Sequence, residues 1–209
     1  MQEDRDDSPR IVVGLGNPGR QYEKTRHNVG FRVLDELRRR WGLGQGRAGF
    51  QGLLWQTRVA RADQRAKVTL LAPMTYMNLS GRSVGELAAF YRALPPDVLV
   101  VLDDMALALG RLRARADGSA GGHNGLIDVL SALGTNEVPR LRIGIGAPVG
   151  FADPKDYVLS VFRPDELEAV EQAIRLAAEA VEDWVFHGIE YVMSKYNRKD
   201  DNQASKDET

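Results

Sequence analysis

The 209-residue chain contains no cysteine. Without thiols there is neither a disulfide framework nor a thiolate nucleophile, and this composition suits a reducing compartment. No apolar run approaches the ~20 residues that cross a bilayer, and the acidic start of the chain lacks the pattern of a signal peptide. We therefore expect a cytoplasmic protein with no membrane association.

The chain also has few aromatic residues and almost no excess of one charge over the other. Aromatics make up 7% of the chain, yet hydrophobic residues reach 43%, which is enough for a packed core. The formal net charge is −1; residues 1–9 carry −3 and residues 199–209 carry −2, which leaves +4 on residues 10–198. This balance permits a polyanionic partner without predicting one. We expect an acidic polar extension (1–9), one α/β domain (10–198) and a polar, disordered tail (199–209).

Strand-like and helix-like periodicities alternate along the chain. This alternation predicts a single three-layer α/β/α domain with a twisted, mostly parallel mixed sheet. The helix that ends near Tyr91 is expected to be capped by Asn78 or Ser80, and the last helix to end at Gly188. The predicted strands are about 10–15, 50–60, 67–72, 98–102, 111–115 and 141–145, and the other predicted helices are about 27–41, 126–133 and 164–188.

Three polar segments follow predicted strands: Asn17 to His27, Tyr76 to Asn78, and Asp103. Ligands in α/β folds gather at the carboxyl ends of strands, so we expect these segments to converge. His27 is the best candidate for a base, because imidazole titrates near neutral pH. Asp103 would orient it and stabilise the imidazolium, although a solvated aspartate at a strand end explains the residue equally well.

Other chemistries fit the glycine-rich turn and the serines less well. Gly14-Leu15-Gly16-Asn17-Pro18-Gly19 matches G-x-G-x-x-G, but Pro18 and a polar loop separate it from the next helix. A dinucleotide site is therefore not expected. Ser80 and Ser119 lack the G-x-S-x-G elbow that exposes a nucleophilic serine. If the protein is a hydrolase, water is the expected nucleophile.

The chain has three histidines, and their spacing pairs none of them with another as metal ligands. We therefore expect no metal site. His187 precedes Gly188, a position that fits a contact with a helix C-terminus. His123 lies in a glycine-rich loop, which it could orient through hydrogen bonds.

Arginines alternate with apolar residues in two predicted strands. Arg111, Arg113 and Arg115 share one face, roughly 6.6 Å apart, and Arg140 and Arg142 repeat the pattern. A charged edge strand accounts for such a stripe, and a phosphate-binding surface accounts for it as well. The residues alone do not separate these two interpretations.

Several motifs follow one another over about residues 10–195. They are Val13-Gly14-Leu15-Gly16-Asn17-Pro18-Gly19, Tyr22, Thr25-Arg26-His27-Asn28-Val29-Gly30, Pro73-Met74-Thr75-Tyr76-Met77-Asn78-Leu79-Ser80-Gly81, Gly121-Gly122-His123-Asn124-Gly125-Leu126 and Arg140-Leu141-Arg142-Ile143-Gly144-Ile145-Gly146. Together they resemble the motifs of bacterial peptidyl-tRNA hydrolases. The resemblance implies a monomeric single-domain α/β enzyme without metal or cofactor. It also implies the reaction, which is hydrolysis of the ester between a peptide and the 3′-terminal ribose of tRNA.

The same resemblance implies roles for individual residues. His27 would activate water, Asp103 would keep His27 basic and oriented, and Asn17 would sense the peptide bond. The chain departs from the family at Ala106 and Ala108, where an aspartate and a proline are usual. The residues implied in binding the 3′ end, the peptide and the acceptor stem are Tyr22, Tyr76, Met77, Asn78, His123, Asn124, Arg113, Arg115 and Arg142.

An alternative function on the same fold is non-catalytic RNA binding, as in splicing factors. The retention of Asn17, His27, Asp103 and Asn124 favours the enzyme.

Overall fold

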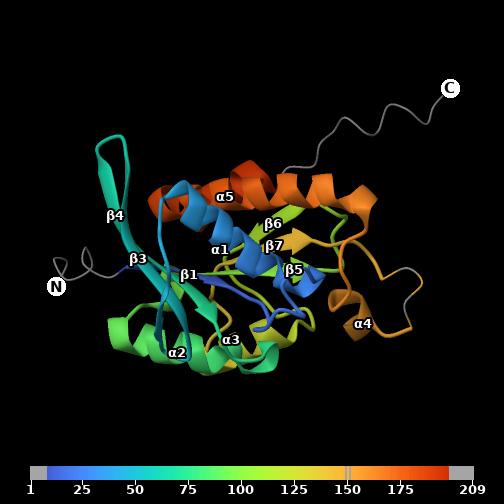
Figure 1. Cartoon of the computed structure of the whole chain (residues 1–209). Helices are drawn as coiled ribbons and strands as arrows, with labels where there is room; N and C mark the ends of the chain where they lie inside the picture. The colour runs from blue at the N-terminus through green and yellow to red at the C-terminus, as the bar shows by residue number, and fades with distance from the viewer. Residues whose placement is uncertain (1–8, 149, 151, 198–209) are drawn as a thin grey trace.

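The computed structural model describes residues 9–148, 150 and 152–197; the predicted tail, and the predicted extension apart from Pro9, lie outside these residues. Helices cover both faces of one sheet (Figure 1), so the predicted three-layer α/β/α domain is confirmed. The strands are β1 (Arg10–Gly14), β2 (Arg47–Gly49), β3 (Gly52–Arg61), β4 (Gln64–Pro73), β5 (Val98–Asp104), β6 (Leu112–Arg115) and β7 (Arg140–Gly144). The helices are α1 (Val29–Arg40), α2 (Ser80–Tyr91), α3 (Asn124–Leu133), α4 (Pro154–Val158) and α5 (Leu167–Tyr196), with 3₁₀ turns η2 (Arg26–Asn28), η3 (Met77–Leu79), η4 (Pro95–Asp97) and η5 (Pro164–Glu166).

The seven strands follow the order β2-β3-β4-β1-β5-β7-β6. The four central strands β4, β1, β5 and β7 are parallel, whereas β2, β3 and β6 pair antiparallel at the two edges. The sheet is therefore mixed as predicted, with its parallel order confined to the centre. β5 is buried along its whole length, because both of its faces are covered. The carboxyl ends of β4, β1 and β5 consequently meet at one edge of the sheet.

Two hydrophobic cores lie on opposite faces of the sheet. The core under α1 and α5 contains Trp184, whose side chain is fully buried, and the core under α2 and α3 contains Leu87 and Leu126. Val170, Ile174 and Val181, from the predicted last helix, are buried in the first core, whereas Leu167 at the start of α5 is exposed. Figure 1 shows the β3–β4 hairpin projecting beyond these layers.

A close approach of α1 to the sheet depends on two glycines. A Cβ atom at Gly30 would lie 2.5 Å from the backbone of Leu15 and 2.6 Å from the carbonyl oxygen of Val101. A Cβ atom at Gly14 would collide with the carbonyl of Gly30. Any side chain at these positions would push the start of α1 away from β1 and β5, and His27 in the preceding turn would move with it.

The predicted cap of α2 is wrong. Neither Asn78 nor Ser80 caps the helix, and the hydroxyl of Ser80 donates to the carbonyl oxygen of Met77 at 2.8 Å. The carboxylate of Asp128 on α3 instead accepts the N–H of Gly81 at 2.6 Å. A carboxylate from the neighbouring helix thus accepts a backbone N–H in the first turn of α2 that would otherwise lack a partner. The side chain of Asn78 is left exposed.

The predicted end of the last helix is also wrong. Gly188 has φ 78° and ψ 179°, which kinks α5, but the helix resumes and ends at Tyr196. It resumes because Val192 packs into the core and because Lys195 and Tyr196 both donate to Asp183. His187 therefore lies at a kink inside α5, where its ring contacts that of Tyr191.

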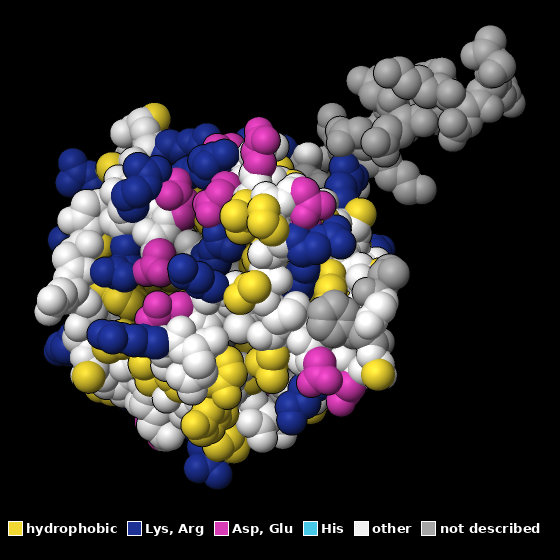
Figure 2. All heavy atoms as spheres, turned by 45° about the vertical axis from the view of Figure 1, so that its right-hand side comes forward, with side chains coloured by type: hydrophobic (Ala, Val, Ile, Leu, Met, Phe, Trp, Pro, Cys, Tyr) yellow, Lys and Arg dark blue, Asp and Glu magenta, His cyan; other side chains and the backbone are white. Residues whose placement is uncertain are grey.

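Charges of both signs alternate on the face drawn in Figure 2, above all over its upper half. Two arginines of α1 pair with acidic side chains of α5: Arg32 contacts Glu171 at 2.5 Å, and Arg40 contacts Glu182 at 3.2 Å. Together with the pairs that Arg38 and Arg39 form within α1, these contacts neutralise the arginines of that helix. None of the described helices has the length and apolar character that a membrane crossing requires.

Candidate active site

A cavity of about 830 Å³ opens at the edge where β4, β1 and β5 end. The three polar segments that were expected to converge do meet there. Two of the twelve predicted site residues, Arg113 and Arg115, are not part of its lining. The ten that line it are Asn17, Tyr22, His27, Tyr76, Met77, Asn78, Asp103, His123, Asn124 and Arg142.

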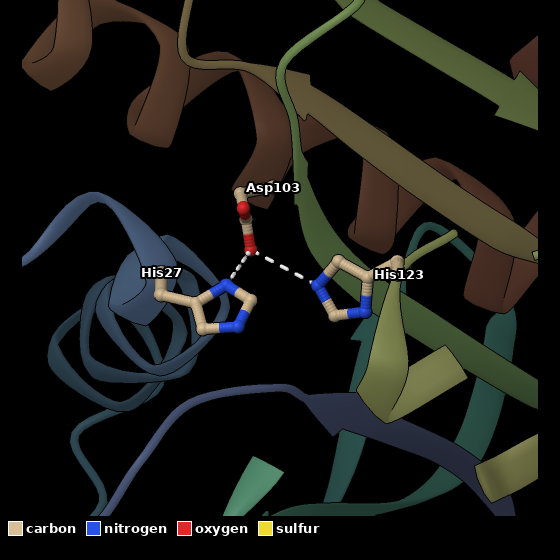
Figure 3. Close-up of side chains that lie close together, drawn as sticks. All are labelled: His27, Asp103 and His123. Atoms are coloured by element: carbon tan, nitrogen blue, oxygen red, sulfur yellow. Dashed lines mark hydrogen bonds and ion pairs between the residues drawn. The ribbon is translucent and has the colours of Figure 1, made fainter. Parts of the chain in front are cut away.

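His27 and Asp103 form a dyad on the wall of the cavity. His27 is carried by η2, Asp103 lies near the end of β5, and the imidazole Nδ1 is 2.7 Å from the carboxylate Oδ1 (Figure 3). A carboxylate only accepts hydrogen bonds, so Nδ1 carries the proton. The Nε2 atom, which Figure 3 shows turned away from Asp103, is then left with its lone pair. The geometry therefore suits a base that is oriented by a carboxylate.

The carboxylate of the dyad is almost completely buried, with a side chain 2% exposed against 12% for His27. Burial alone would raise the pKa of Asp103, but attraction and hydrogen bonding from His123 and His27 outweigh burial and hold that pKa well below its usual range. Asp103 is therefore ionised at neutral pH, as a partner for a protonated imidazole must be.

His123 contacts the same carboxylate, although the spacing of the histidines in the sequence did not suggest that two of them would meet. Its Nε2 lies 3.1 Å from Oδ1 of Asp103, and its Nδ1 accepts the N–H of Leu126 at 3.2 Å as the N-cap of α3. The rings of His27 and His123 are 5.0 Å apart. Ligand atoms of the two imidazoles and the carboxylate all lie within 4.8 Å of one another, a separation at which a metal ion could be held.

Asn17 is fixed by hydrogen bonds on both its backbone and its side chain. Its Oδ1 accepts the N–H of Met77 at 2.9 Å, so its NH₂ group is the part left to face the cavity. The amide of Asn28 binds both the N–H and the C=O of Asn17, each at 2.9 Å. Sequence reasoning missed this role of Asn28; its place directly after His27 in a polar stretch was the available signal.

Two other asparagines line the cavity with their amides free. Asn78 and Asn124 are exposed, and within the described part of the chain neither side chain makes a hydrogen bond. Tyr76, which is 58% exposed, stands at the rim. These groups can both donate to and accept from a polar ligand.

Arg26 ties the turn that carries His27 to the segment around α4. Its guanidinium donates to Glu166 at 2.6 Å and lies 4.5 Å and 4.6 Å from the ring centroids of Tyr157 and Phe162. Its backbone N–H donates to the carbonyl of Ser160 at 2.9 Å. This clamp also escaped sequence reasoning, because its partners lie more than 100 residues away.

The segment held by this clamp forms part of the cavity wall. Lys155, Val158 and Leu159, from α4 and its C-cap, are among the residues that line the cavity. No sequence pattern singled them out. Lys155 adds a positive charge to the wall.

The arginine stripe is divided by burial. Arg113 and Arg115 are exposed on β6, whereas Arg142 lines the cavity. The Nε atom of Arg142 lies 2.9 Å from Oδ2 of Asp104. The two groups form an ion pair, but they are not oriented for a hydrogen bond. Arg140 does not continue the exposed stripe: it is 1% exposed and donates to backbone carbonyls, including that of Gly118 at 2.7 Å. The loop that contains Gly118 and Ser119 covers the Arg140 side chain, and this burial lowers the pKa of Arg140.

Comparison with known proteins agrees with the resemblance seen in the motifs. The family profile described as peptidyl-tRNA hydrolase matches residues 11–205. The peptidyl-tRNA hydrolase of Symbiobacterium thermophilum is 50% identical over 90% of this chain and 98% of its own length, and that of Synechocystis is 47% identical over 92% and 97%.

Solved structures show the same similarity in three dimensions. The crystal structure of peptidyl-tRNA hydrolase from Acinetobacter baumannii superposes with a TM-score of 0.80 at 35% sequence identity, covering 91% of this chain and 95% of that one. The profile match includes every element that builds the cavity, and the sequence identity and the superposition each cover about nine-tenths of the chain. The chain therefore belongs to the peptidyl-tRNA hydrolase family.

Proposed function

We propose that the cavity hydrolyses the ester between a peptide and the 3′-terminal ribose of tRNA, releasing free tRNA for reuse in translation. The observation that carries this proposal is the His27–Asp103 dyad with the oriented amide of Asn17 in the same cavity. The family supplies the substrate class, and the described side chains supply the chemistry.

His27 acts as the general base. Its Nε2 takes a proton from water while the water oxygen attacks the ester carbonyl, and Asp103 stabilises the imidazolium that forms. When the tetrahedral intermediate collapses, the bond from carbon to the ribose oxygen breaks and that oxygen receives the proton from His27. An activated ester needs little more than one positioned base, worth roughly 10²–10⁴-fold, together with orientation. No covalent intermediate with the protein is required.

Asn17 distinguishes peptidyl-tRNA from aminoacyl-tRNA. Because its Oδ1 is occupied by the N–H of Met77, it presents only N–H donors to the substrate. A donor pairs with the carbonyl oxygen of a peptide bond but opposes the ammonium group of an uncapped amino acid. The selectivity thus follows from the orientation of one amide.

The remaining cavity residues hold the substrate. Asn78 and Asn124 offer free amides to the ribose and the peptide, Tyr22 and Tyr76 offer aromatic faces at the mouth, and Met77 forms part of the apolar floor.

The arginines bind tRNA phosphates near the acceptor stem. Arg113 and Arg115 are exposed and have no ion-pair partner within the described ranges, unlike the paired arginines of α1. Arg142 contributes from inside the cavity. One copy of the chain supplies all of these groups, which supports a monomer, and the cytoplasm, where translation takes place, is the proposed setting.

The test compares two substrates that differ by one acetyl group. We expect release of tRNA from N-acetyl-aminoacyl-tRNA and little release from the free aminoacyl-tRNA. Hydrolysis of both at equal rates would contradict the role of Asn17. Binding of both without hydrolysis would favour the RNA-binding alternative, which the assembled dyad argues against.

A further inference from the structure

The helix cap made by His123 determines where the proton on its ring lies. Nδ1 accepts the N–H of Leu126 at 3.2 Å, the N-cap hydrogen bond of α3. A neutral imidazole has one N–H, and a nitrogen that accepts a hydrogen bond is not the one that carries it. The proton of neutral His123 is therefore on Nε2.

Among the described residues, that N–H has one partner. Nε2 of His123 lies 3.1 Å from Oδ1 of Asp103, the same oxygen that accepts Nδ1–H of His27 at 2.7 Å (Figure 3). One carboxylate oxygen thus receives two N–H donors, from segments 96 residues apart in the chain. Both ring nitrogens of His123 are engaged by the protein, which leaves neither for a hydrogen bond with the substrate.

We infer that His123 is a positioning residue: the N-terminus of α3 locks its ring in the Nε2–H tautomer, and the locked ring fixes Asp103 as the partner of His27. This inference rests on the proposed role of His27 as the base. It replaces the expectation that His123 binds the 3′ end or the peptide. The sequence Gly122-His123-Asn124 then separates two tasks, with His123 facing the dyad and Asn124 facing the cavity.

The same geometry argues against two other roles. A histidine that binds a metal through one nitrogen donates a proton from the other. In His123 the other nitrogen, Nδ1, faces the N–H of Leu126. With a metal on Nε2 the ring proton would be on Nδ1, and that N–H would point at the N–H of Leu126. Protonation of His123 to act as a general acid would create the same conflict. The spacing of His27, Asp103 and His123 resembles a metal site, but the hydrogen-bond directions do not fit one.

The second donor changes the proton affinity of the dyad. A carboxylate that already receives one N–H attracts an imidazolium less strongly, so His27 returns its proton to the leaving ribose oxygen more readily. The other titratable or charged side chains lining the cavity are Tyr22, Tyr76, Asp104, Arg142 and Lys155, and in the described structure none of them bonds to Asp103.

A first experiment reads the tautomer without substrate. The chain has three histidines, so ¹⁵N-histidine labelling gives few signals, which His187→Gln and His27→Ala assign. We expect the neutral ring of His123 to show protonated Nε2 and unprotonated Nδ1. An Nδ1–H tautomer would overturn the inference whether or not the protein hydrolyses peptidyl-tRNA.

A second experiment separates the cap from the contact with Asp103. In His123→Asn the side chain is still a strong N-cap but is too short to reach Asp103 as well, whereas His123→Ala loses both. We expect the melting temperature to fall by about 2 to 4 °C in His123→Ala and to stay near wild type in His123→Asn.

The pH dependence of kcat/KM for N-acetyl-aminoacyl-tRNA gives the deciding result. In both variants we expect its acid limb to move to higher pH by about 0.5 to 1 unit, because the dyad holds a proton more tightly without the second donor. An acid limb that moves in His123→Ala but not in His123→Asn would reduce His123 to a helix cap, and an acid limb that moves in neither would refute its action on the dyad. If His123→Ala does not fold, the asparagine variant and the labelled wild type still decide the question.

Discussion

At the cavity Asp103 receives its hydrogen bonds from two imidazoles, whereas Asp183 on α5 receives its hydrogen bonds from an arginine, a lysine and a tyrosine. Both carboxylates are buried, with side chains 2% and 3% exposed. Burial alone would raise the pKa of Asp183, but hydrogen bonds from Arg61, Lys195 and Tyr196, at 2.5 to 2.8 Å, lower it to about 2. Both aspartates are therefore ionised.

The difference lies in the donors. The hydrogen bond to Asp183 raises the pKa of Lys195, and burial together with that carboxylate raises the pKa of Tyr196 to about 12. None of the partners of Asp183 exchanges a proton near neutral pH, so this cluster fastens the β3–β4 hairpin to α5 without proton transfer in that range. Imidazoles do exchange protons in that range. A buried ionised carboxylate does not mark an active site by itself; the chemistry of its donors does.

Removing one donor from each aspartate gives the largest contrast. We expect His27→Ala to lower kcat/KM by about 10²- to 10⁴-fold with tRNA binding preserved, because the base is lost and the binding surface is not. Arg61→Ala should leave hydrolysis unchanged and lower the urea midpoint of unfolding. Steady-state kinetics and urea titration of both variants check this. Near wild-type turnover in His27→Ala would exclude it as the base.

Replacing the aspartates themselves sharpens the same contrast. Asp103→Asn should lower kcat by up to about 10⁴-fold, because the imidazole remains but loses its orienting charge and its correct tautomer. Asp183→Asn should leave kcat unchanged and lower the free energy of unfolding by about 1 to 3 kcal/mol. If Asp183→Asn reduced kcat as strongly as Asp103→Asn, the division between a reactive and a fastening cluster would fail.

An asparagine-to-aspartate substitution should alter the preference for N-acetyl-aminoacyl-tRNA when it lies in the cavity, but not when it lies elsewhere. Asn17→Asp puts an acceptor where the NH₂ group was, so it attracts the free ammonium of aminoacyl-tRNA. We expect the preference for N-acetyl-aminoacyl-tRNA to fall about 10-fold, the equivalent of one charged hydrogen bond. Asn136→Asp, in an exposed loop, is the matched control. Unchanged selectivity in Asn17→Asp would remove its sensing role.

Charge reversal compares β6 with the hairpin. Arg113→Glu with Arg115→Glu should weaken tRNA binding several-fold and reduce its dependence on salt, by about one unit of slope for each phosphate that the variant no longer neutralises. The control pair, Arg58→Glu with Arg65→Glu, changes charge equally on the exposed hairpin. Binding assays at several salt concentrations measure both. Equal effects of the two pairs would assign the β6 arginines to edge protection.

The smallest expected effect is on acid stability. The carboxyl of Asp183 has a lower pKa in the folded protein than its ordinary value of 3.8, so its contribution to stability is present above that value and is lost as the pH falls through about 2. The stability difference between wild type and Asp183→Asn should therefore shrink below pH 4 and vanish near pH 2. Urea titrations at pH 5, 3 and 2 measure it. A difference that persists at pH 2 would show that packing, not charge, is responsible.

Local patterns were sufficient to predict the layers and the convergence of the three polar segments, whereas they left open whether Asp103 orients His27, a role that the family resemblance implied. The layers and the convergence follow from hydrophobic periodicity and from the rule that parallel strands bring their carboxyl ends to one edge. The same patterns show which residues share a strand face but not what covers that face. Arg140 and Arg115 are paired across β7 and β6, yet a loop buries the first and leaves the second in solvent.

Contacts between distant segments were beyond prediction from one sequence. The two donors of Asp103, the hold of Asn28 on Asn17 and the cap supplied by Asp128 to α2 each depend on the direction of a side chain across a gap that the fold defines. Hydrogen bonds of this kind leave no periodic signal, because they join single residues and not faces. The sequence did not predict the kink at Gly188 for a related reason. A glycine at such a position usually ends a helix, but here contacts of the residues beyond it keep the chain helical to Tyr196.

The clamp made by Arg26 bears on how this cavity could be blocked. Its guanidinium is held between two aromatic rings and ion-paired to Glu166, while its backbone hydrogen-bonds the same segment, so the wall around α4 and the turn bearing the imidazole behave as one body. A small molecule that wedges under this wall would tilt the imidazole out of line with its carboxylate without touching either group. An inhibitor of this protein therefore need not compete for the place of the ester.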